Sequence, residues 1–315
     1  CAMEKMYGAR LSSSQKQYSE ACEMLKYAKQ NFDKIPEELY VEICFVFTLI
    51  EKKFVSLNSA VEFLKDQKKI LPESIELDIH YQSHEAAKYL NTDPEKALDF
   101  YYKIIQYVGI SKRNNKSIGH AYVDILTCYI LSENWNLFEH TYSEALEYVQ
   151  TNAQYAEEGR IYNLDGLYYW LKGDFYTSDN YFRNSQFYLG LAHNRNTDIF
   201  VKINFVGLLI QMKKFDEAKV ELEIAHNLLK KTFQILFQQI ENTKDYKHYR
   251  EYAALLVLIK YAMELGVLYI VQDLINEIPI KKLCVHVKQM EKGIFPEEVF
   301  TNTCIVHENI VTLTR

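Results

Sequence analysis

Glycine and proline are scarce in this chain, which has 10 glycines and 5 prolines among 315 residues. Both residues interrupt regular helices, so their scarcity favours long helices without breaks. The chain is also 48% hydrophobic and 14% aromatic, which argues against disorder. A chain of this length can form either two domains or one elongated repeat array, and both can bury a large core.

The sequence has no basic stripe and no long apolar run. Its formal net charge is −6, with 36 lysines and arginines scattered among 42 aspartates and glutamates. We therefore expect no binding to nucleic acid through this chain alone, and none to an anionic membrane. The longest apolar runs, 44–50 and 253–259, are too short to span a bilayer.

Paired cysteines are also absent, because the six cysteines lie far apart and form no CxxC motif. Cys22, Cys44 and Cys128 fall among apolar residues of expected helices, where a reduced thiol behaves as a small hydrophobic group. This usage indicates a reducing compartment, so the expected location is cytoplasmic. A chain that begins with Cys1 can be a processed lipoprotein, but the residues that follow are not a polar tether, and a truncated chain is the favoured interpretation.

Motifs for catalysis are missing too: we find no glycine-rich phosphate loop, no GxSxG and no HExxH. His80 and His84 lie four residues apart beside Glu85, a spacing that could hold zinc, but no third ligand is evident. A second candidate metal set comprises Cys284, His286, Cys304 and His307. Its first pair is separated by a single residue, which is unfavourable. We expect no catalytic residues, no metal and no cofactor, and hence no enzyme.

The segment 162–189 predicts two antiparallel helices joined at 172–174. Gly166 would let the two helices approach closely, and Gly173 and Asp174 suit the end of one helix and the cap of the next. The second helix carries Ser178, Phe182 and Ser185 on one stripe, at i, i+4 and i+7.

The same stripe recurs along the chain. The stripes begin at Ala21, Leu57, Ala97, Phe138, Ser178 and Ala218. Successive first residues are therefore 36, 40, 41, 40 and 40 residues apart. This recurrence predicts an all-α fold, a right-handed α-solenoid of about six to seven antiparallel helix pairs with a period near 40 residues.

The array is expected to cover 1–278, followed by a C-terminal capping segment over 279–315 for which the pattern indicates no single structure. The stripe at Ala21 belongs to a second helix, yet a full first helix does not fit before it. We therefore expect an incomplete first repeat, either because upstream sequence is missing or because the first helix is short.

A row of polar residues marks the candidate site. Each lies three residues before a small residue of a first helix, and residues at i and i−3 share a helix face. The row comprises His84, Asp124, Asn163 and Asn204. The same faces add Arg160, Leu167, Trp170 and Gln211. A mixture of amide, acidic and apolar groups suits an extended peptide, whose backbone offers a donor and an acceptor at each residue. The alternative is that the two asparagines bond locally and that Trp170 belongs to the core.

Segment 162–189 resembles a tetratricopeptide repeat. The matching residues are Gly166, Tyr169, Gly173, Ser178, Phe182 and Ser185, while Tyr162 stands where the usual tryptophan would be. Degenerate repeats of about 40 residues with asparagine on the inward helix also resemble the peptide-pheromone sensors of Gram-positive bacteria, the Rap, NprR and PlcR group. That resemblance implies that Asn163 and Asn204 hold a peptide backbone and that binding changes the superhelical pitch, as in quorum sensing. Neither a helix-turn-helix domain nor the helical bundle of Rap phosphatases can be matched.

The expected function is therefore the ligand-sensing part of a cytoplasmic regulator, with a short peptide or an extended protein segment in the concave groove. A passive protein-interaction scaffold without switching is the alternative. A homodimer through the terminal helices is also expected to be feasible, because an array that ends without a polar cap leaves an apolar face exposed.

Overall fold

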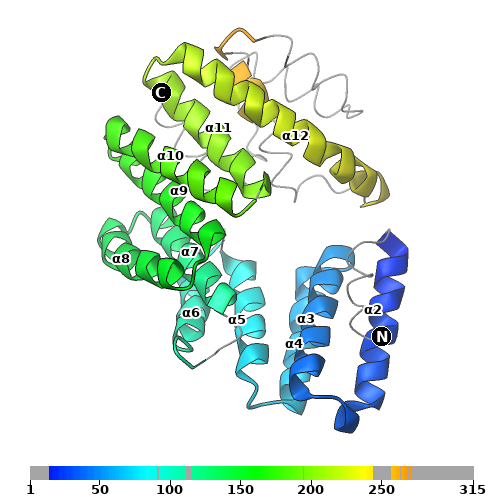
Figure 1. Ribbon diagram of the computed structural model, residues 1–315. Helices are drawn as coiled ribbons and strands as arrows, with labels where there is room; N and C mark the ends of the chain where they lie inside the picture. Colours follow the sequence, from blue (N-terminus) through cyan, green and yellow to red (C-terminus); the bar gives the residue numbers. More distant parts are fainter. Residues whose placement is uncertain are drawn as a thin grey trace. The chain divides into compact units, whose positions relative to one another are not determined.

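The computed structural model describes residues 14–90, 92–110, 115–193, 195–243, 257–262, 264–267 and 270. Within these ranges the regular structure is helical and contains no strand (Figure 1). The chain divides into two compact units, 1–132 and 133–315, and the boundary between them lies in the turn after α7. The expected all-α solenoid is confirmed by this architecture.

The first unit contains α2 to α7. Its elements are α2 (Ser14–Gln30), the short 3-10 helix η1 (Phe32–Lys34), α3 (Glu37–Phe54), α4 (Leu57–Ile70), α5 (Ile75–Tyr89), α6 (Pro94–Ile105) and α7 (Asn115–Leu131). Each helix packs on the next, and α3, α5 and α7 also contact one another in series. These three first helices therefore form one layer, and α2, α4 and α6 form the other.

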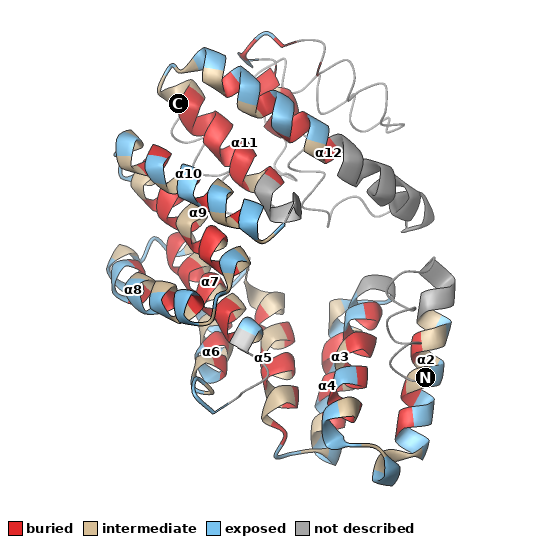
Figure 2. Cartoon of the chain, viewed as in Figure 1, coloured by how far each residue is buried: buried red, intermediate tan, exposed pale blue. Residues whose placement is uncertain are grey.

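The second unit contains α8 to α12. Its elements are α8 (Trp135–Thr151), α9 (Tyr155–Leu171), α10 (Phe175–Leu191), α11 (Arg195–Gln211) and α12 (Phe215–Thr243), followed by helical residues at 257–262. Helix α9 contacts α8, α10 and α11, so α9 and α11 are neighbouring first helices. Figure 2 shows the consequence: the described part of α11 is buried almost throughout, whereas α10 and α12 alternate buried and exposed residues.

A regular 20-residue module builds this unit. Helices α8, α9, α10 and α11 are each 17 residues long, and three-residue turns join them. Each turn places one residue at a positive φ of 51–81°, every 20 residues along the chain. These residues are Glu133, Ala153, Gly173, His193 and Lys213. Two modules make the 40-residue period that the sequence predicts.

The turns end their helices in the same way. After α9, the backbone N–H of Asp174 donates to the carbonyl of Tyr169 at 2.9 Å, and that of Gly173 donates to Trp170 at 3.0 Å. This pair of bonds is the Schellman arrangement, which satisfies the last carbonyls of a helix. The Asp174 carboxylate then accepts from the N–H of Thr177 at 3.1 Å and caps α10. The predicted roles of Gly173 and Asp174 are confirmed.

The predicted second-helix stripes form the core. Of the residues in these six stripes, Leu57 and Tyr142 are half-buried and all the others are buried. Gly166 is needed for close approach, since a Cβ there would lie 3.0 Å from the Phe182 ring. The hydroxyl of Ser178 donates to the Gly166 carbonyl at 2.7 Å. Serine can therefore replace alanine in this stripe without leaving a buried hydroxyl unpaired.

Other boundaries agree in part with the sequence. Pro36 directly precedes α3, and α12 is long, with 29 residues. Pro72 does not begin a helix: it lies in the turn before α5, which begins at Ile75. The capping segment 279–315 lies outside the described residues.

Gly207 also differs from its predicted role. The sequence aligns it with Gly166, which packs on the second helix of its own pair. The structure instead places Gly207 against α9 and the helical residues 257–262, because a Cβ there would lie 2.7 Å from the Trp170 ring and would also collide with the Tyr261 hydroxyl. Tyr261 belongs to the helical residues 257–262. Gly207 therefore controls how closely α11 approaches α9 and the helical residues 257–262.

Candidate functional site

The predicted site residues all lie on first helices of the repeats. His84 and Asp124 belong to α5 and α7 of the first unit. The other six belong to α9 and α11 of the second unit, namely Arg160, Asn163, Leu167, Trp170, Asn204 and Gln211. Continuity of the row between the two units stays a prediction.

Asn163 and Asn204 meet directly. The side-chain amide of Asn204 donates to Oδ1 of Asn163 over 3.0 Å, which joins α11 to α9. Asn204 is buried, whereas Asn163 is half-buried. The bond uses one N–H of Asn204 and one lone pair of Asn163, and an amide side chain offers two donors and two lone pairs in all.

The sequence left open whether these amides bond locally, and the structure shows a bond between consecutive repeats.

Trp170 and Gln211 form a second link between α9 and α11. The Trp170 indole N–H donates to Oε1 of Gln211. Trp170 is only 2% exposed, and its ring packs edge-on against Phe182 at 6.2 Å. Leu167 is buried as well. Trp170 and Leu167 therefore belong to the core beneath the candidate site, as the alternative interpretation of Trp170 states. Arg160 and Gln211 are half-buried.

In the first unit, His84 is buried against its own helix. Its Nδ1 lies 2.8 Å from the carbonyl oxygen of His80. Burial lowers the pKa of His84, and the nearby Lys52 amine lowers it further. The neutral ring therefore donates from Nδ1 to the carbonyl and keeps Nε2 as an acceptor. His80 stacks on Phe45 of α3 with ring centroids 4.2 Å apart.

Lys52 is a functional candidate that sequence reasoning missed. Although this side chain is exposed, the protein atoms crowded around its amine lower its pKa, and the carboxylate of Asp124 partly opposes that effect. Lys52, His84 and Asp124 thus interact electrostatically from three consecutive first helices. Lys52 lies 32 residues before His84, outside the 40-residue period, so the repeat spacing carried no signal for it.

The sequence offers two candidate sets of metal ligands, His80 with His84 and a second set in the C-terminal segment. No group of three or more histidine, cysteine, aspartate or glutamate side chains that could hold a metal ion occurs in the part of the chain that the structure describes. The second candidate set, Cys284, His286, Cys304 and His307, lies outside the described residues. Cys22, Cys44 and Cys128 are free thiols. Burial raises the pKa of Cys44 and of Cys128 to about 12, so these two thiols are unreactive packing groups.

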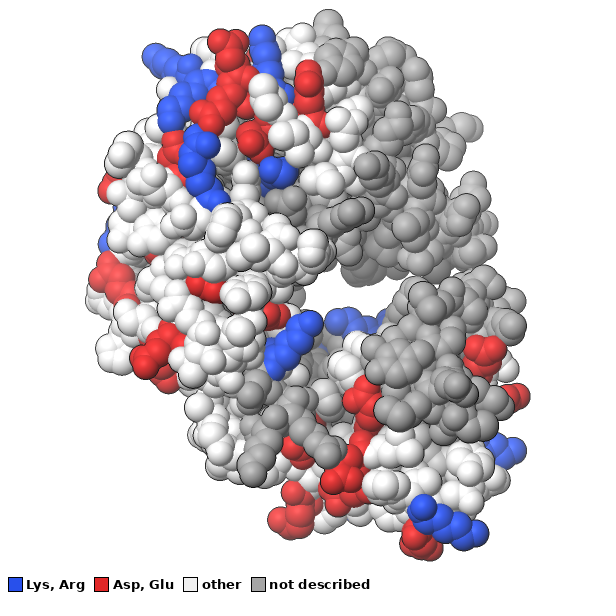
Figure 3. All heavy atoms as spheres, viewed as in Figure 1, with Lys and Arg blue, Asp and Glu red and all other residues white. Residues whose placement is uncertain are grey.

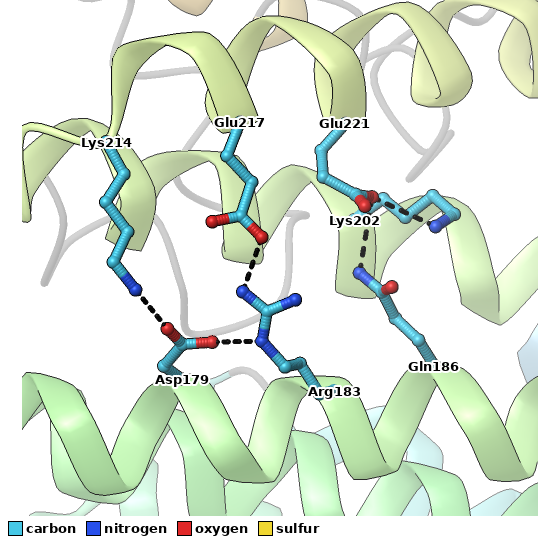
Figure 4. A network of polar contacts seen from close by, with 7 residues as sticks. All are labelled: Asp179, Arg183, Gln186, Lys202, Lys214, Glu217 and Glu221. Carbon is cyan, nitrogen blue, oxygen red and sulfur yellow. Dashed lines mark hydrogen bonds and ion pairs between the residues drawn. The ribbon is translucent and has the colours of Figure 1, made fainter.

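A polar network holds α10, α11 and α12 together (Figure 4). Asp179 of α10 accepts from Lys214 and from Arg183, both at 2.5 Å, and Arg183 also reaches Glu217 of α12. Lys202 of α11 pairs with Glu221 at 3.0 Å. On the face seen in Figure 3, lysines and arginines lie among aspartates and glutamates and form no basic stripe over the described residues. The network is a structural link between helices.

Three solved structures share this fold. One is a signal transduction ATPase with numerous domains that carries a tetratricopeptide repeat sensor, from Pyrococcus horikoshii, with 16% identity and a TM-score of 0.55 over 92% of this chain. This chain spans only 43% of that protein. The second is the apo form of RapI, with 15% identity and a TM-score of 0.55, covering 87% of this chain and 94% of RapI.

The third is BtubC from P. vanneervenii, with 17% identity and a TM-score of 0.53, covering 69% of this chain and 91% of BtubC. At these identities the likeness concerns the fold. No family model and no curated protein matches the sequence. The resemblance to tetratricopeptide-like arrays, including a member of the Rap group, is thus confirmed at the level of structure. None of the described helices has the length and apolar character needed to cross a membrane.

Proposed function

We propose that this chain binds a short peptide or an extended protein segment along its first helices, and that it is the ligand-sensing part of a cytoplasmic regulator. The observation that carries the proposal is the contact between Asn163 and Asn204, which brings two side-chain amides of successive repeats within 3.0 Å. An extended peptide presents donors and acceptors along its backbone, and adjacent amides from consecutive repeats match that pattern.

The same contact supports switching. The bond spans α9 and α11, and a peptide amide that takes the Oδ1 lone pair of Asn163 now used by Asn204 would displace it. Ligand binding would then exchange a bond between the two helices for bonds to the ligand. Because Asn204 is buried, its amide must follow the ligand or find a new partner, so the spacing of α9 and α11 changes.

The polar groups of the first unit belong to the same proposal. Lys52, His84 and Asp124 present a cation, a neutral imidazole and a carboxylate from α3, α5 and α7. Such a set can bind the charged side chains or a terminus of a peptide. The solved tetratricopeptide repeat sensor and RapI lend support through their fold.

The alternative is a passive scaffold that holds a folded partner without changing shape. The links between α10, α11 and α12 favour this alternative, because they resist a change in helix spacing. A sensor must bind short peptides and change its dimensions, whereas a scaffold needs only a partner surface.

The test is binding of the full chain to an immobilised array of random short peptides, followed by small-angle X-ray scattering of the chain with the peptides that bind. We expect peptides that bind the wild type and not the Asn163→Ala, Asn204→Ala variant, together with a changed scattering profile. The matched control is Asn180→Ala, Asn184→Ala, which removes two exposed asparagines of α10 and should leave binding intact.

Equal binding by all three proteins would refute the asparagine site. Selective binding without a change in scattering would favour the scaffold. Absence of any peptide binding, with the wild type folded, would overturn the sensor.

A further inference from the structure

Asp165 is a buried acid on the side of α9 away from Asn163. It is 4% exposed. It follows Asn163 by two residues, which turns it by about 200° around the helix. Its side chain therefore serves the junction with α8 and α10 rather than the candidate binding site.

Three helices meet at this carboxyl. The hydroxyl of Tyr142 on α8 and that of Tyr181 on α10 both hydrogen-bond to it. Oδ2 of Asp165 has no hydrogen-bond partner among the described residues. One carboxyl on α9 thus connects α8 with α10, and one of its two oxygens remains unsatisfied in a buried place.

Aromatic rings surround the carboxyl. Tyr169 stacks on Tyr181 with centroids 5.4 Å apart, and Tyr162 lies 6.1 Å from Tyr181. The pKa values of Tyr142, Tyr162, Tyr169 and Tyr181 are all raised, first by burial and then by interactions that include the nearby Asp165. These tyrosines are therefore neutral hydroxyl donors throughout the physiological pH range.

Most charged groups of the adjoining helices are engaged elsewhere or exposed. On α8, Glu139 contacts Lys172 and the Tyr168 hydroxyl. On α9, Glu158 accepts from Gln150 at 2.8 Å, Glu157 is a second buried acid, and Arg160 is half-buried. The remaining titratable residues of α8 apart from its tyrosines are exposed, namely His140, Glu144 and Glu147.

On α10, Asp179 and Arg183 pair with each other and with α12 (Figure 4). On α11, Lys202 pairs with Glu221 at 3.0 Å, and α11 meets α9 on the Asn163 side. Among the described residues, no cation is therefore one of the groups that act on Asp165.

We propose that Asp165 is a proton-dependent clamp, which holds α8 on α9 and α10 while its carboxyl is neutral and loosens α8 when it ionises. A neutral carboxyl fits a junction of tyrosine rings. An anion with one unsatisfied oxygen and no cation beside it is unfavourable there, and moving α8 away lets water reach it. This inference does not depend on the nature of any ligand.

The pH range follows from the same environment. Burial raises the pKa of Asp165 from 3.8 to about 7, against the opposing effect of the two tyrosine hydrogen bonds. The folded state therefore keeps a proton that the unfolded chain releases. Stability from this group is greatest below the unfolded pKa, falls as pH rises from there to about 7, and stays at its lower value above that.

The experiment uses the full chain with Trp170→Phe, so that Trp135 of α8 is the single tryptophan. Trp135 packs against Tyr168 of α9 at 5.7 Å, and quenching of its fluorescence by acrylamide reports whether α8 is seated. We expect quenching to increase through about pH 7 and to lose this transition on adding Asp165→Asn. Urea unfolding should show the matching linkage. As pH is raised towards 7, the ratio of the unfolding equilibrium constant of the wild type to that of Asp165→Asn should rise by up to about tenfold per pH unit.

Two further variants separate a clamp from a merely structural acid. Tyr142→Phe removes a hydrogen bond that lowers the Asp165 pKa, so the quenching transition should move to higher pH. Asp179→Asn, on a buried acid paired with Arg183 and Lys214, should leave the transition in place. A pH transition that survives Asp165→Asn, or no transition between about pH 5 and pH 8.5, would overturn the proposal.

Discussion

The amide of Asn204 donates to Oδ1 of Asn163 over 3.0 Å, although the two residues lie 41 positions apart in the chain. The bond joins two first helices that succeed each other after two 20-residue modules. Its partners differ in exposure, since Asn204 is buried and Asn163 is half-buried. The contact therefore links two buried or half-buried side chains of consecutive repeats, and Asn163 is the partner that keeps some exposure to solvent.

Replacing either asparagine tests the structural part of this contact. Asn163→Ala leaves the buried N–H of Asn204 without its acceptor, so we expect a loss of about 1–3 kcal/mol in the free energy of unfolding. The double variant should lose less than the sum of the single variants, with a coupling of about 1 kcal/mol in a urea-unfolding cycle. Additive losses would show that the bond does not persist in solution.

Gly207 is predicted to tolerate no side chain. A Cβ there would lie 2.7 Å from the Trp170 ring and would collide with Tyr261. Gly207→Ala should therefore destabilise the protein by about 1–3 kcal/mol, as overpacking does in other cores. Thermal or urea unfolding would measure the loss.

Gly190 is the matched control on α10. A Cβ at Gly190 meets nothing within 4 Å, so Gly190→Ala should stabilise by about 0.5–1 kcal/mol through helix propensity. The same sign for both alanine variants would contradict the packing described around Gly207.

In the turns between α7 and α12, glycine should stabilise the protein because one residue of each turn has a positive φ. Lys213 has a φ of 59° at the position where Gly173 has 81°. A residue with a Cβ costs about 1 kcal/mol in this conformation, so Lys213→Gly should stabilise the protein by up to that amount. Gly173→Ala should destabilise it for the same reason. Equal unfolding midpoints for Lys213→Gly and wild type would show that the cost is compensated by other contacts of Lys213.

The contribution of His80 to stability should fall in mild acid. Burial, with a smaller effect of His84, lowers the pKa of His80 from 6.5 to about 4. The unfolded chain therefore binds a proton that the folded protein excludes, and stability is lost as pH falls from 6.5 towards 4. The loss is up to about 3 kcal/mol. His80→Phe keeps a ring against Phe45 and should weaken this dependence.

His80 and Asp165 act in opposite directions on the pH scale. Their pH ranges overlap, from about 4 to 6.5 for His80 and from 3.8 to about 7 for Asp165, so the two effects oppose each other in the wild type and each shows fully in the variant that lacks the other group. The Asp165→Asn and His80→Phe variants separate the two contributions. A profile identical to wild type in the His80→Phe variant would contradict the burial of that ring.

The row of polar residues shows where sequence reasoning reached its limit. The helical spacing placed Asn163 and Asn204 on corresponding faces, and they do meet. Spacing alone left open whether these amides bond to each other, because that depends on the distance between α9 and α11. Lys52 was missed because its position breaks the period, and only packing brings its amine near His84 and Asp124.

The sequence by itself determined the helices, their turns and the repeat. Scarce glycine and proline, stripes about 40 residues apart and caps such as Asp174 are local features, and local physics is enough to place them. Only the tertiary structure decided what depends on neighbours distant in the chain. It packed Gly207 on Trp170 and Tyr261 rather than on its own pair, buried Trp170, and enclosed Asp165 among tyrosines of three helices. The physical reason is that helix periodicity specifies which residues share a face, while the distance to the next helix is set by the volumes of all the side chains between them.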